Sequence, residues 1–204
     1  SRKLRIANLE NISRLLPAAT ETCFKSDDGW LSVPFEKAVK RVKSKGAKLK
    51  TEDYKPSGAI PIVDQGQSEI VGYTDRGNAL FQGPIPVIIF GDHTKNIKYI
   101  DFDFAVGADG VVILRPIDNI VPEYFYYWLK SIPLHSLGYS RHYKLLKEQI
   151  VYFPEDKAKQ RSIVEYLNGL QSKAEELKQL QAETEIELAA FTPALLAKAF
   201  RGEL

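Results

Sequence analysis

The chain carries IVEYLNGLQSKAEELKQLQAETEIELAAFTPAL at residues 163–195, and this stretch decides its fold. Its apolar residues recur at alternating spacings of four and three, the a/d pattern of a coiled-coil seam. The ten seam positions, which we predict to form a dimer or partner interface, are Ile163, Leu167, Leu170, Ala174, Leu177, Gln181, Thr184, Leu188, Phe191 and Leu195. A helix of about 35 residues is roughly 50 Å long. We therefore expect it to act as a spacer and a docking surface.

Capping residues and prolines predict where the helices end. Asp156 is placed to cap the start of the long helix. Pro193 is expected to break or kink it before residues 194–200, and Gly202 to stop it. Near the other terminus, the apolar spacing predicts a short helix over residues 4–16 that Pro17 stops.

The middle of the chain has β texture. Short β-branched runs punctuated by Gly, Pro, Asn and Asp predict strands at 60–63, 70–73, 86–90, 110–116 and 144–153. A helix is predicted over 122–132, with its inward face formed by Tyr124, Phe125, Tyr127, Trp128 and Leu129. We therefore predict an α+β fold. A mixed β-rich domain with small helices spans residues 1–154, and a long coiled-coil helix spans residues 155–204.

Charge is distributed unevenly along the chain. Its 44% hydrophobic and 26% charged residues predict a folded protein, and the net charge of +2 alone assigns no partner. From Glu36 to Lys55, eight basic and three acidic residues leave +5, whereas from Glu155 to Thr192 eight acidic and five basic residues leave −3. A basic body and an acidic helix favour an anionic partner for the body alone, although the lysine-rich run is also compatible with a merely solvated surface.

Cysteine usage and hydropathy bear on location. Cys23 is the only cysteine, so no internal disulfide can form and a reducing, cytoplasmic compartment is expected. Cys23 itself is predicted to be a small buried side chain rather than a catalytic thiol. No apolar run approaches membrane-spanning length, no signal peptide is evident, and we find no internal repeat.

The sequence lacks the common catalytic motifs. It contains no phosphate-binding loop, no Gly-x-Gly cofactor loop and no Asn/Asp-Pro-Pro-aromatic segment, and its three histidines lack metal-ligand spacing. The carboxylates of Asp92, Asp101 and Asp103 suggest a metal-dependent nuclease as an alternative. The strand-like alternation of residues 101–104 favours a structural role for them instead. We predict no catalytic residue, no cofactor and no metal.

Four polar loops and the basic stretch are suited to reading DNA. Base edges and phosphates are contacted by polar, cationic and aromatic side chains held on rigid elements. The residues that we predict to bind DNA are Lys43, Lys45, Lys48, Lys50, Gln65, Gln67, Tyr73, Arg76, Asn78, His93, Thr94, Lys95, Asn96, Tyr139, Ser140, Arg141, His142 and Lys144. Each loop alone is more simply a solvated hairpin. Four loops beside a basic stretch favour a nucleic-acid interface.

Several segments together resemble the specificity subunit of type I restriction–modification systems. They are IPIV at 60–63 with Gly66, VIIFGD at 87–92, ADGVVIL at 108–114, YFYYWL at 124–129, QIVYFP at 149–154, QRSIVEYL at 160–167 and LLAKAFRGEL at 195–204. The resemblance implies a target recognition domain and a helical spacer without catalysis of their own. It also implies double-stranded DNA as a partner, together with methyltransferase subunits and, through them, the restriction subunit.

Family members usually carry two recognition domains and two spacers, each domain reading half of a split DNA site, whereas this chain has one of each. A natural half-length subunit and half of a divided protein both remain open. Because an exposed seam needs a cover, and because the first predicted helix is too short to supply one, we predict an antiparallel homodimer. The alternatives are a metal-dependent nuclease and a protein-only coiled-coil scaffold.

Overall fold

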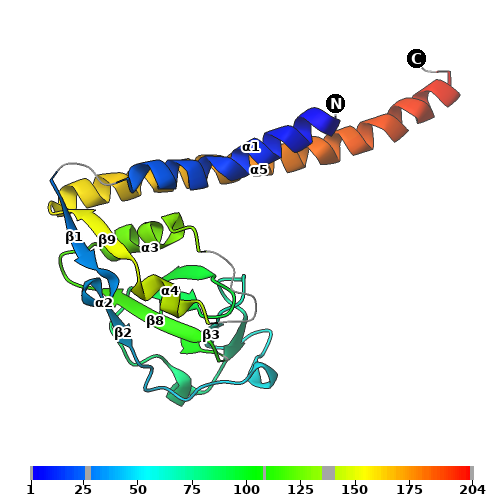
Figure 1. Cartoon of the computed structure of the whole chain (residues 1–204). Coiled ribbons are helices and arrows are strands. Elements are labelled where there is room, and N and C mark those ends of the chain that lie inside the picture. The colour runs from blue at the N-terminus through cyan, green and yellow to red at the C-terminus, as the bar shows by residue number, and fades with distance from the viewer. Residues whose placement is uncertain (1, 26–28, 108, 135–140, 203–204) are drawn as a thin grey trace. The chain divides into compact units, whose positions relative to one another are not determined.

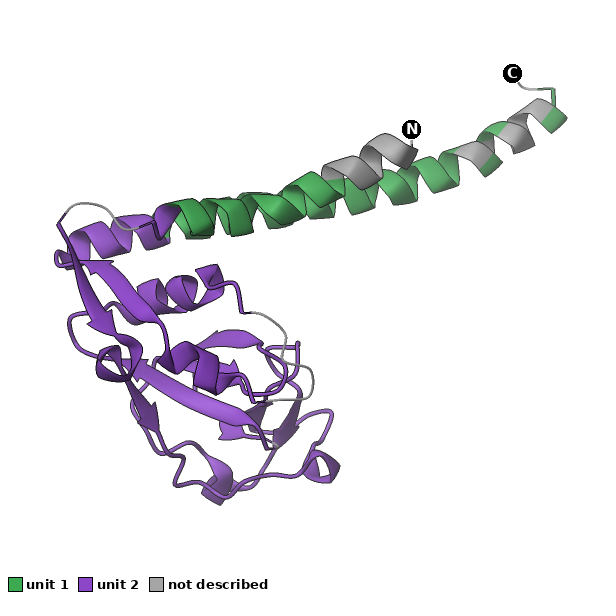
Figure 2. Cartoon of the chain, viewed as in Figure 1, with its two compact units in different colours: residues 1–22, 165–204 green, residues 23–164 purple. Residues whose placement is uncertain are grey.

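The computed structural model describes residues 2–25, 29–107, 109–134 and 141–202 (Figure 1). Within its helices, the side chains of residues 2–8, 192, 194 and 196–199 lie outside this description. The chain forms two compact units, one of residues 23–164 and one of residues 1–22 with 165–204 (Figure 2). The predicted division places the N-terminal helix with the recognition domain. The structure groups that helix with the long one.

The largest sheet of residues 23–164 has four strands in the order β2-β8-β5-β6, and all neighbours are antiparallel. They are β2 (Val39–Val42), β8 (Val111–Pro116), β5 (Val87–Gly91) and β6 (Ile97–Ile100). Every residue of β5 is buried, which explains why its sequence is continuously apolar rather than alternating. The strand predicted at 86–90 is therefore confirmed.

Two smaller sheets complete the β structure. One has the order β4-β3-β7, formed by β4 (Gly72–Thr74), β3 (Ile60–Val63) and β7 (Ala105–Val106). The other pairs β1 (Trp30–Pro34) with β9 (Ile150–Pro154) in antiparallel register. Two 3₁₀ turns, η1 (Thr51–Asp53) and η2 (Gly77–Ala79), lie between the strands of this body. Short strands of this kind position many loops close together.

Three short helices pack on the strands: α2 (Phe35–Ala38), α3 (Pro122–Ser131) and α4 (Tyr143–Lys147). The five buried residues of α3 are the five that the sequence predicts, and Pro122 begins the helix where its missing N–H costs nothing. The strand prediction for 144–153 is wrong in its first half, because α4 buries Leu146 there. Residues 101–104 also lie outside the strands, because β6 ends at Ile100, although Phe104 is still buried.

Helix α1 spans Arg2–Cys23, so the prediction that Pro17 ends it is wrong. Ile12 and Thr20 are both buried, one on each side of the proline. Burial on both sides offsets the single backbone hydrogen bond that proline removes. The helix is therefore longer than the apolar spacing alone predicts.

Helix α5 spans Lys157–Phe200 and is 44 residues long. The Asp156 cap is confirmed, because Asp156 Oδ1 accepts a hydrogen bond from the Ala158 N–H at 2.8 Å. Gly202 follows the helix with a φ of +69°, as expected of a glycine stop. The predicted break at Pro193 is wrong, because α5 continues through this residue to Phe200. A proline in a helix interior costs about 3 kcal/mol, and the remaining hydrogen bonds of a helix this long offset that cost. Among the described residues no helix has the length and apolarity needed to cross a membrane.

Candidate nucleic-acid interface

Gln65 holds two of the predicted reading loops, residues 65–68 and 91–96, together with residues 109–110. Its carbonyl oxygen accepts hydrogen bonds from Thr94 Oγ1 at 2.6 Å and from Asn96 Nδ2 at 2.9 Å. Its side chain accepts one from the His93 N–H at 3.2 Å and donates one to the Asp109 carbonyl at 2.9 Å. We call residues 64–68, 91–96 and 109–110 the Gln65 loop cluster. Several donors that the sequence assigns to base reading therefore shape the loops as well.

Two glycines allow the loops of this cluster to approach so closely. A Cβ at Gly91 would collide with the Thr94 hydroxyl and with Gln65. Gly110 has a φ of +89°, and a Cβ there would collide with the Gln65 side-chain amide. A larger residue at either position would push the loops apart.

Asp92 ties the segment after residue 140 to the loop cluster. Its Oδ1 accepts a hydrogen bond from the Tyr143 N–H at 2.9 Å, and its carbonyl accepts one from the His142 N–H at 2.8 Å. Its own N–H donates to the Gly110 carbonyl at 2.8 Å, and the Arg141 guanidinium lies 3.9 Å from its carboxylate. The sequence suggested a nuclease role for Asp92. The structure shows a buried carboxylate that positions loops.

Lys98, in strand β6, binds the loop of residues 64–68 through its side chain. Its buried ammonium donates to the Ser68 carbonyl at 2.5 Å and lies 3.9 Å from Asp64, which in turn accepts a hydrogen bond from the Gly66 N–H at 2.7 Å. Burial lowers the pKa of Lys98 below its ordinary value of 10.5, and the nearby Asp64 and Glu69 partly oppose this. Sequence reasoning misses this role, because Lys98 has the appearance of any polar residue in an alternating strand.

The basic stretch adjoins the Gln65 loop cluster through Lys48, whose ammonium lies 3.3 Å from Asp109. Lys43, Lys45 and Lys50 are exposed, and buried Leu49 anchors the segment. Surface ion pairs such as that of Lys48 are worth less than about 1 kcal/mol. A DNA phosphate can therefore replace the carboxylate at small cost.

Arg76 and Asn78 belong to a second group of loops, which follows Tyr73 in strand β4. The Arg76 guanidinium pairs with Asp53 at 2.9 Å, and the Asn78 carbonyl accepts a hydrogen bond from the Ala47 N–H. Nearby, Asp75 accepts a hydrogen bond from Lys55, which lowers the pKa of the Asp75 carboxyl. These contacts connect the second group to residues 47–59 rather than to Gln65.

The remaining predicted contact residues are placed unevenly. Gln67, Arg141 and Lys144 are exposed, whereas Lys95 donates to the Leu134 carbonyl at 3.4 Å. His142 is only 1% exposed and its Nδ1 lies 3.0 Å from the Asp92 carbonyl, so it is placed to support the loops. We remove it from the set that we expect to touch DNA. Tyr139 and Ser140 lie outside the described residues.

The nuclease alternative gains no support from these carboxylates. Asp92 is buried and hydrogen-bonded, whereas Asp101 and Asp103 are exposed in the segment after β6. In the part of the chain that the structure describes, no three His, Cys, Asp or Glu residues come close enough to hold a metal ion. Cys23 is half-buried and burial raises its pKa, which disfavours a thiolate.

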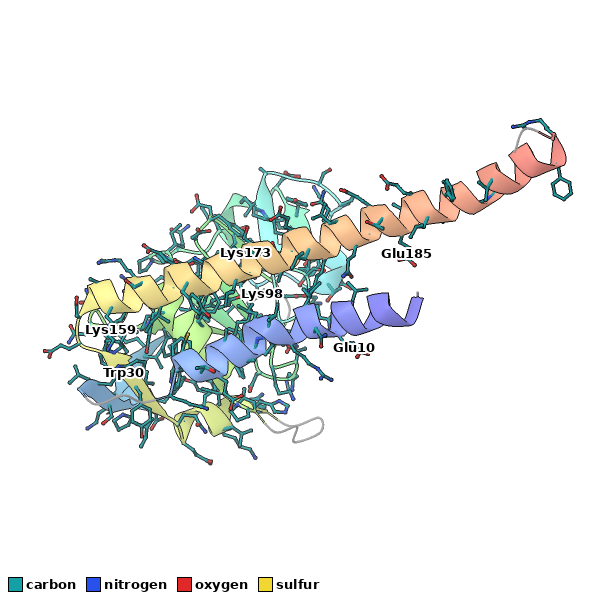
Figure 3. The ribbon with its side chains drawn as sticks, turned by 90° about the horizontal axis from the view of Figure 1, so that it is seen from above. Glu10, Trp30, Lys98, Lys159, Lys173 and Glu185 are labelled. Carbon is teal, nitrogen blue, oxygen red and sulfur yellow. The ribbon has the colours of Figure 1, made fainter. Side chains whose placement is uncertain are left out.

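The seam of α5 is covered only in its first half. Leu167 and Ala174 are buried, and Ile163, Leu170 and Gln181 are half-buried. The exposed seam positions follow from Leu177 onward, and they are Leu177, Thr184, Leu188, Phe191 and Leu195. Within the same compact unit α1 runs antiparallel alongside the first part of α5 (Figures 1 and 3). The second half of the seam remains available to a partner.

The sequence of the chain matches one family model and is similar to a known specificity subunit. Residues 38–188 match the family model described as the type I restriction modification DNA specificity domain. Over 88 residues the chain is 34% identical to the specificity subunit of the type I restriction enzyme EcoR124I/EcoR124II of Escherichia coli. That match covers 42% of this chain and 22% of the relative.

Solved structures of this kind share the fold. A chain from a study of complex assembly and conformational transition of the type I R-M system aligns with a TM-score of 0.75 at 22% identity, covering 100% of this chain and 55% of that one. The HsdS subunit from Thermoanaerobacter tengcongensis gives a TM-score of 0.62 at 22% identity, over 100% of this chain and 54% of that one. The S subunit from M. genitalium gives 0.60 at 19% identity, over 90% and 55%. The chain thus spans about half the length of these solved structures.

Proposed function

The chain belongs to the family of type I restriction–modification DNA specificity subunits, and from this premise we propose that it reads one half of a split DNA site. The observation that carries the proposal is the Gln65 loop cluster, because several loops are fixed to one another beside exposed lysines. Rigid loops with polar tips favour base reading, and flanking lysines favour phosphate contacts. Gln67, Arg141 and Lys144 are the side chains that we expect to reach DNA first.

We further propose that the chain is non-catalytic and works in the cytoplasm by recruiting methyltransferase subunits and, through them, the restriction subunit. The chemistry then belongs to those partners. The acidic second half of α5 is available for such a partner, whereas the basic stretch of residues 36–55 is suited to the anionic DNA.

The exposed half of the seam supports a homodimer of antiparallel α5 helices. Leu188, Phe191 and Leu195 lie on one helical face and are exposed in a single chain. Closed two-fold symmetry pairs identical faces. The polar positions Gln181 and Thr184 are suited to setting the register once α1 leaves the first half of the seam, which faces the second half of the partner's seam in this arrangement. Two identical recognition domains would then read a palindromic split site.

Selection of bound DNA from a randomised pool, with and without Mg²⁺, tests the proposal. We expect retention of sequences with two inverted half-sites separated by a constant gap, without cleavage. Arg141→Ala should change the base preferred at one position, typically by about 1–3 kcal/mol, whereas Arg161→Ala on α5 should not. Cleavage would support the nuclease alternative, and failure to retain DNA in low salt would support the scaffold alternative.

A further inference from the structure

The chain carries a short internal repeat, so the expectation that it has none is wrong. Residues 17–25 read PAATETCFK and residues 193–201 read PALLAKAFR. Both follow the pattern Pro-Ala, five residues, Phe and then Lys or Arg. In both copies the proline lies inside a helix, an unusual position for proline. The two copies therefore share an unusual helical proline and the same spacing from this proline to the phenylalanine.

The phenylalanine of the N-terminal copy, Phe24, packs inside the compact unit of residues 23–164. Phe24 is 9% exposed, and its ring meets the Tyr124 ring edge-on with centroids 5.0 Å apart. Tyr124 is fully buried, its hydroxyl donates to the Tyr152 carbonyl at 3.0 Å, and the Trp30 ring lies 6.5 Å away. Phe24 therefore fills an aromatic site that is built for a ring. We call this site the Tyr124 site.

The C-terminal copy lacks such a cover. Phe200 is 89% exposed, more than any other large apolar side chain of the described residues. Ile12 and Leu188 each stand twelve residues before the phenylalanine of their copy, and they are 8% and 47% exposed. Apolar side chains that are buried in one copy are thus exposed in the other, which marks the end of α5 as an interaction surface.

The proposed antiparallel dimer carries this end toward a Tyr124 site. Pairing Gln181 with Thr184 of the partner subunit places Phe200 opposite Glu165 of the partner subunit, because paired residue numbers keep a constant total. In the chain, Glu165 directly follows the compact unit that contains Tyr124. Within one chain, α1 lies beside α5, and Glu10 of α1 lies level with the part of α5 between Lys173 and Glu185 (Figure 3). Helix α1 therefore runs along α5 where the end of a second α5 would run.

We propose that the end of α5 is a second docking segment, in which Phe200 packs on the Tyr124 site of a second copy in place of Phe24. This inference rests on the proposed homodimer for its geometry. Helix α1 is then an intramolecular competitor that occupies the site until the partner's helix end displaces it. The lysine or arginine that follows each phenylalanine stays in solvent in either state, since Lys25 is exposed in the docked copy.

A labelled peptide of residues 185–204 tests the proposal by fluorescence anisotropy on full-length chains that all carry Phe200→Ala, so that no chain's own Phe200 competes with the peptide. Phe24→Ala empties the Tyr124 site, so the variant should bind the peptide at least about tenfold more tightly than the chain that retains Phe24 does, because Phe24 no longer competes. The same peptide carrying Phe200→Ala should lose this binding. Leu15→Ala, an exposed change on the same helix, is the matched control and should leave binding as weak as in the chain that retains Leu15 and Phe24.

Equal binding to the Phe24→Ala and Leu15→Ala chains, or equal binding by the Phe200→Ala peptide, would overturn the proposal. A photocrosslinking residue in place of Phe200 in the otherwise unmodified chain covers the case in which Phe24→Ala does not fold. Crosslinks should then map to the peptides that contain Trp30 or Tyr124, and crosslinks confined to α5 would contradict docking. Peptide binding needs neither two associated chains nor DNA. Its failure is therefore distinguishable from a failure of dimerisation or of DNA reading.

Discussion

The Tyr143 backbone N–H donates a hydrogen bond to Asp92 Oδ1 at 2.9 Å, across 51 residues of sequence. This contact joins the start of α4 to the loop that follows β5. Together with the bonds that converge on Gln65, it makes separate loops behave as one surface.

Replacement of Asp92 by alanine should reduce the free energy of unfolding by about 1–3 kcal/mol, because the half-buried Tyr143 N–H loses its hydrogen-bond partner. It should also broaden the DNA sequences selected from a random pool. Asp92→Asn retains an acceptor oxygen and should cost less, and Asp101→Ala, an exposed change, serves as the control. Chemical denaturation together with pool selection measures both effects. An Asp92→Ala protein with unaltered sequence preference would contradict the positioning role.

Charge reversal of Lys43 or Lys45 should weaken binding to all DNA sequences about equally. Each lost phosphate contact should lower the slope of log affinity against log salt by about one. Titrations at several salt concentrations check this, with Lys178→Glu on α5 as the control. A change of sequence preference in the lysine variants would show that these residues read bases.

The recognition domain should require the first turns of α5. Gln160 is fully buried and its side chain accepts a hydrogen bond from the Val121 N–H at 2.8 Å and donates to the Pro154 carbonyl at 2.8 Å. A chain ending after Pro154 should therefore unfold more easily than one ending after Val164, which should keep its fold. Comparison of their thermal melting temperatures decides between the predicted boundary at 154 and one at 164. Equal melting temperatures would show that Gln160 is dispensable.

Lys98 should make stability depend on pH in the alkaline range. Its pKa is lowered in the folded state, so between that value and the ordinary value of 10.5 the unfolded chain binds more protons. The contribution of Lys98 to the free energy of unfolding should therefore be smallest below this window and rise with pH through it. Lys98→Met should remove this contribution, which the difference between its denaturation curves and those of the unmodified chain at stepwise increasing pH would show. Lys144→Met, an exposed change, should retain it.

Leu188→Glu should convert dimers to monomers that bind only half-sites, because a charge would enter the seam. Ile186→Glu is the matched control, since Ile186 is exposed but lies off the seam. Static light scattering at tens of micromolar measures the mass of each protein. An unmodified chain that is already monomeric under these conditions would sink the homodimer and leave a partner subunit as the cover.

Local patterns predicted the elements whose signals are themselves local. The central strand β5 and all five buried residues of α3 follow from apolar runs and helical spacing. The prediction that Pro17 ends the first helix is wrong. The sequence shows the hydrogen bond that proline removes, but it does not show that Ile12 and Thr20 are buried on the two sides of Pro17. The sequence predicts His142 as a DNA contact and does not show which groups Asp92 binds, because the two residues are partners that lie some fifty residues apart. No local pattern reports such a contact.

The ties at Gln65 and Asp92 have a consequence for redesigning the specificity of this protein. Residues 92–96 donate hydrogen bonds to Gln65 and supply the Asp92 carboxylate that accepts one from the Tyr143 N–H. Grafting residues 92–96 alone from a relative would break these hydrogen bonds. The incoming segment would then be presented in a different shape from the one it had in its parent. Residues 64–68, 91–96, 109–110 and 141–143 are therefore best transplanted as a single cassette, and new specificities are best sought by shuffling whole cassettes.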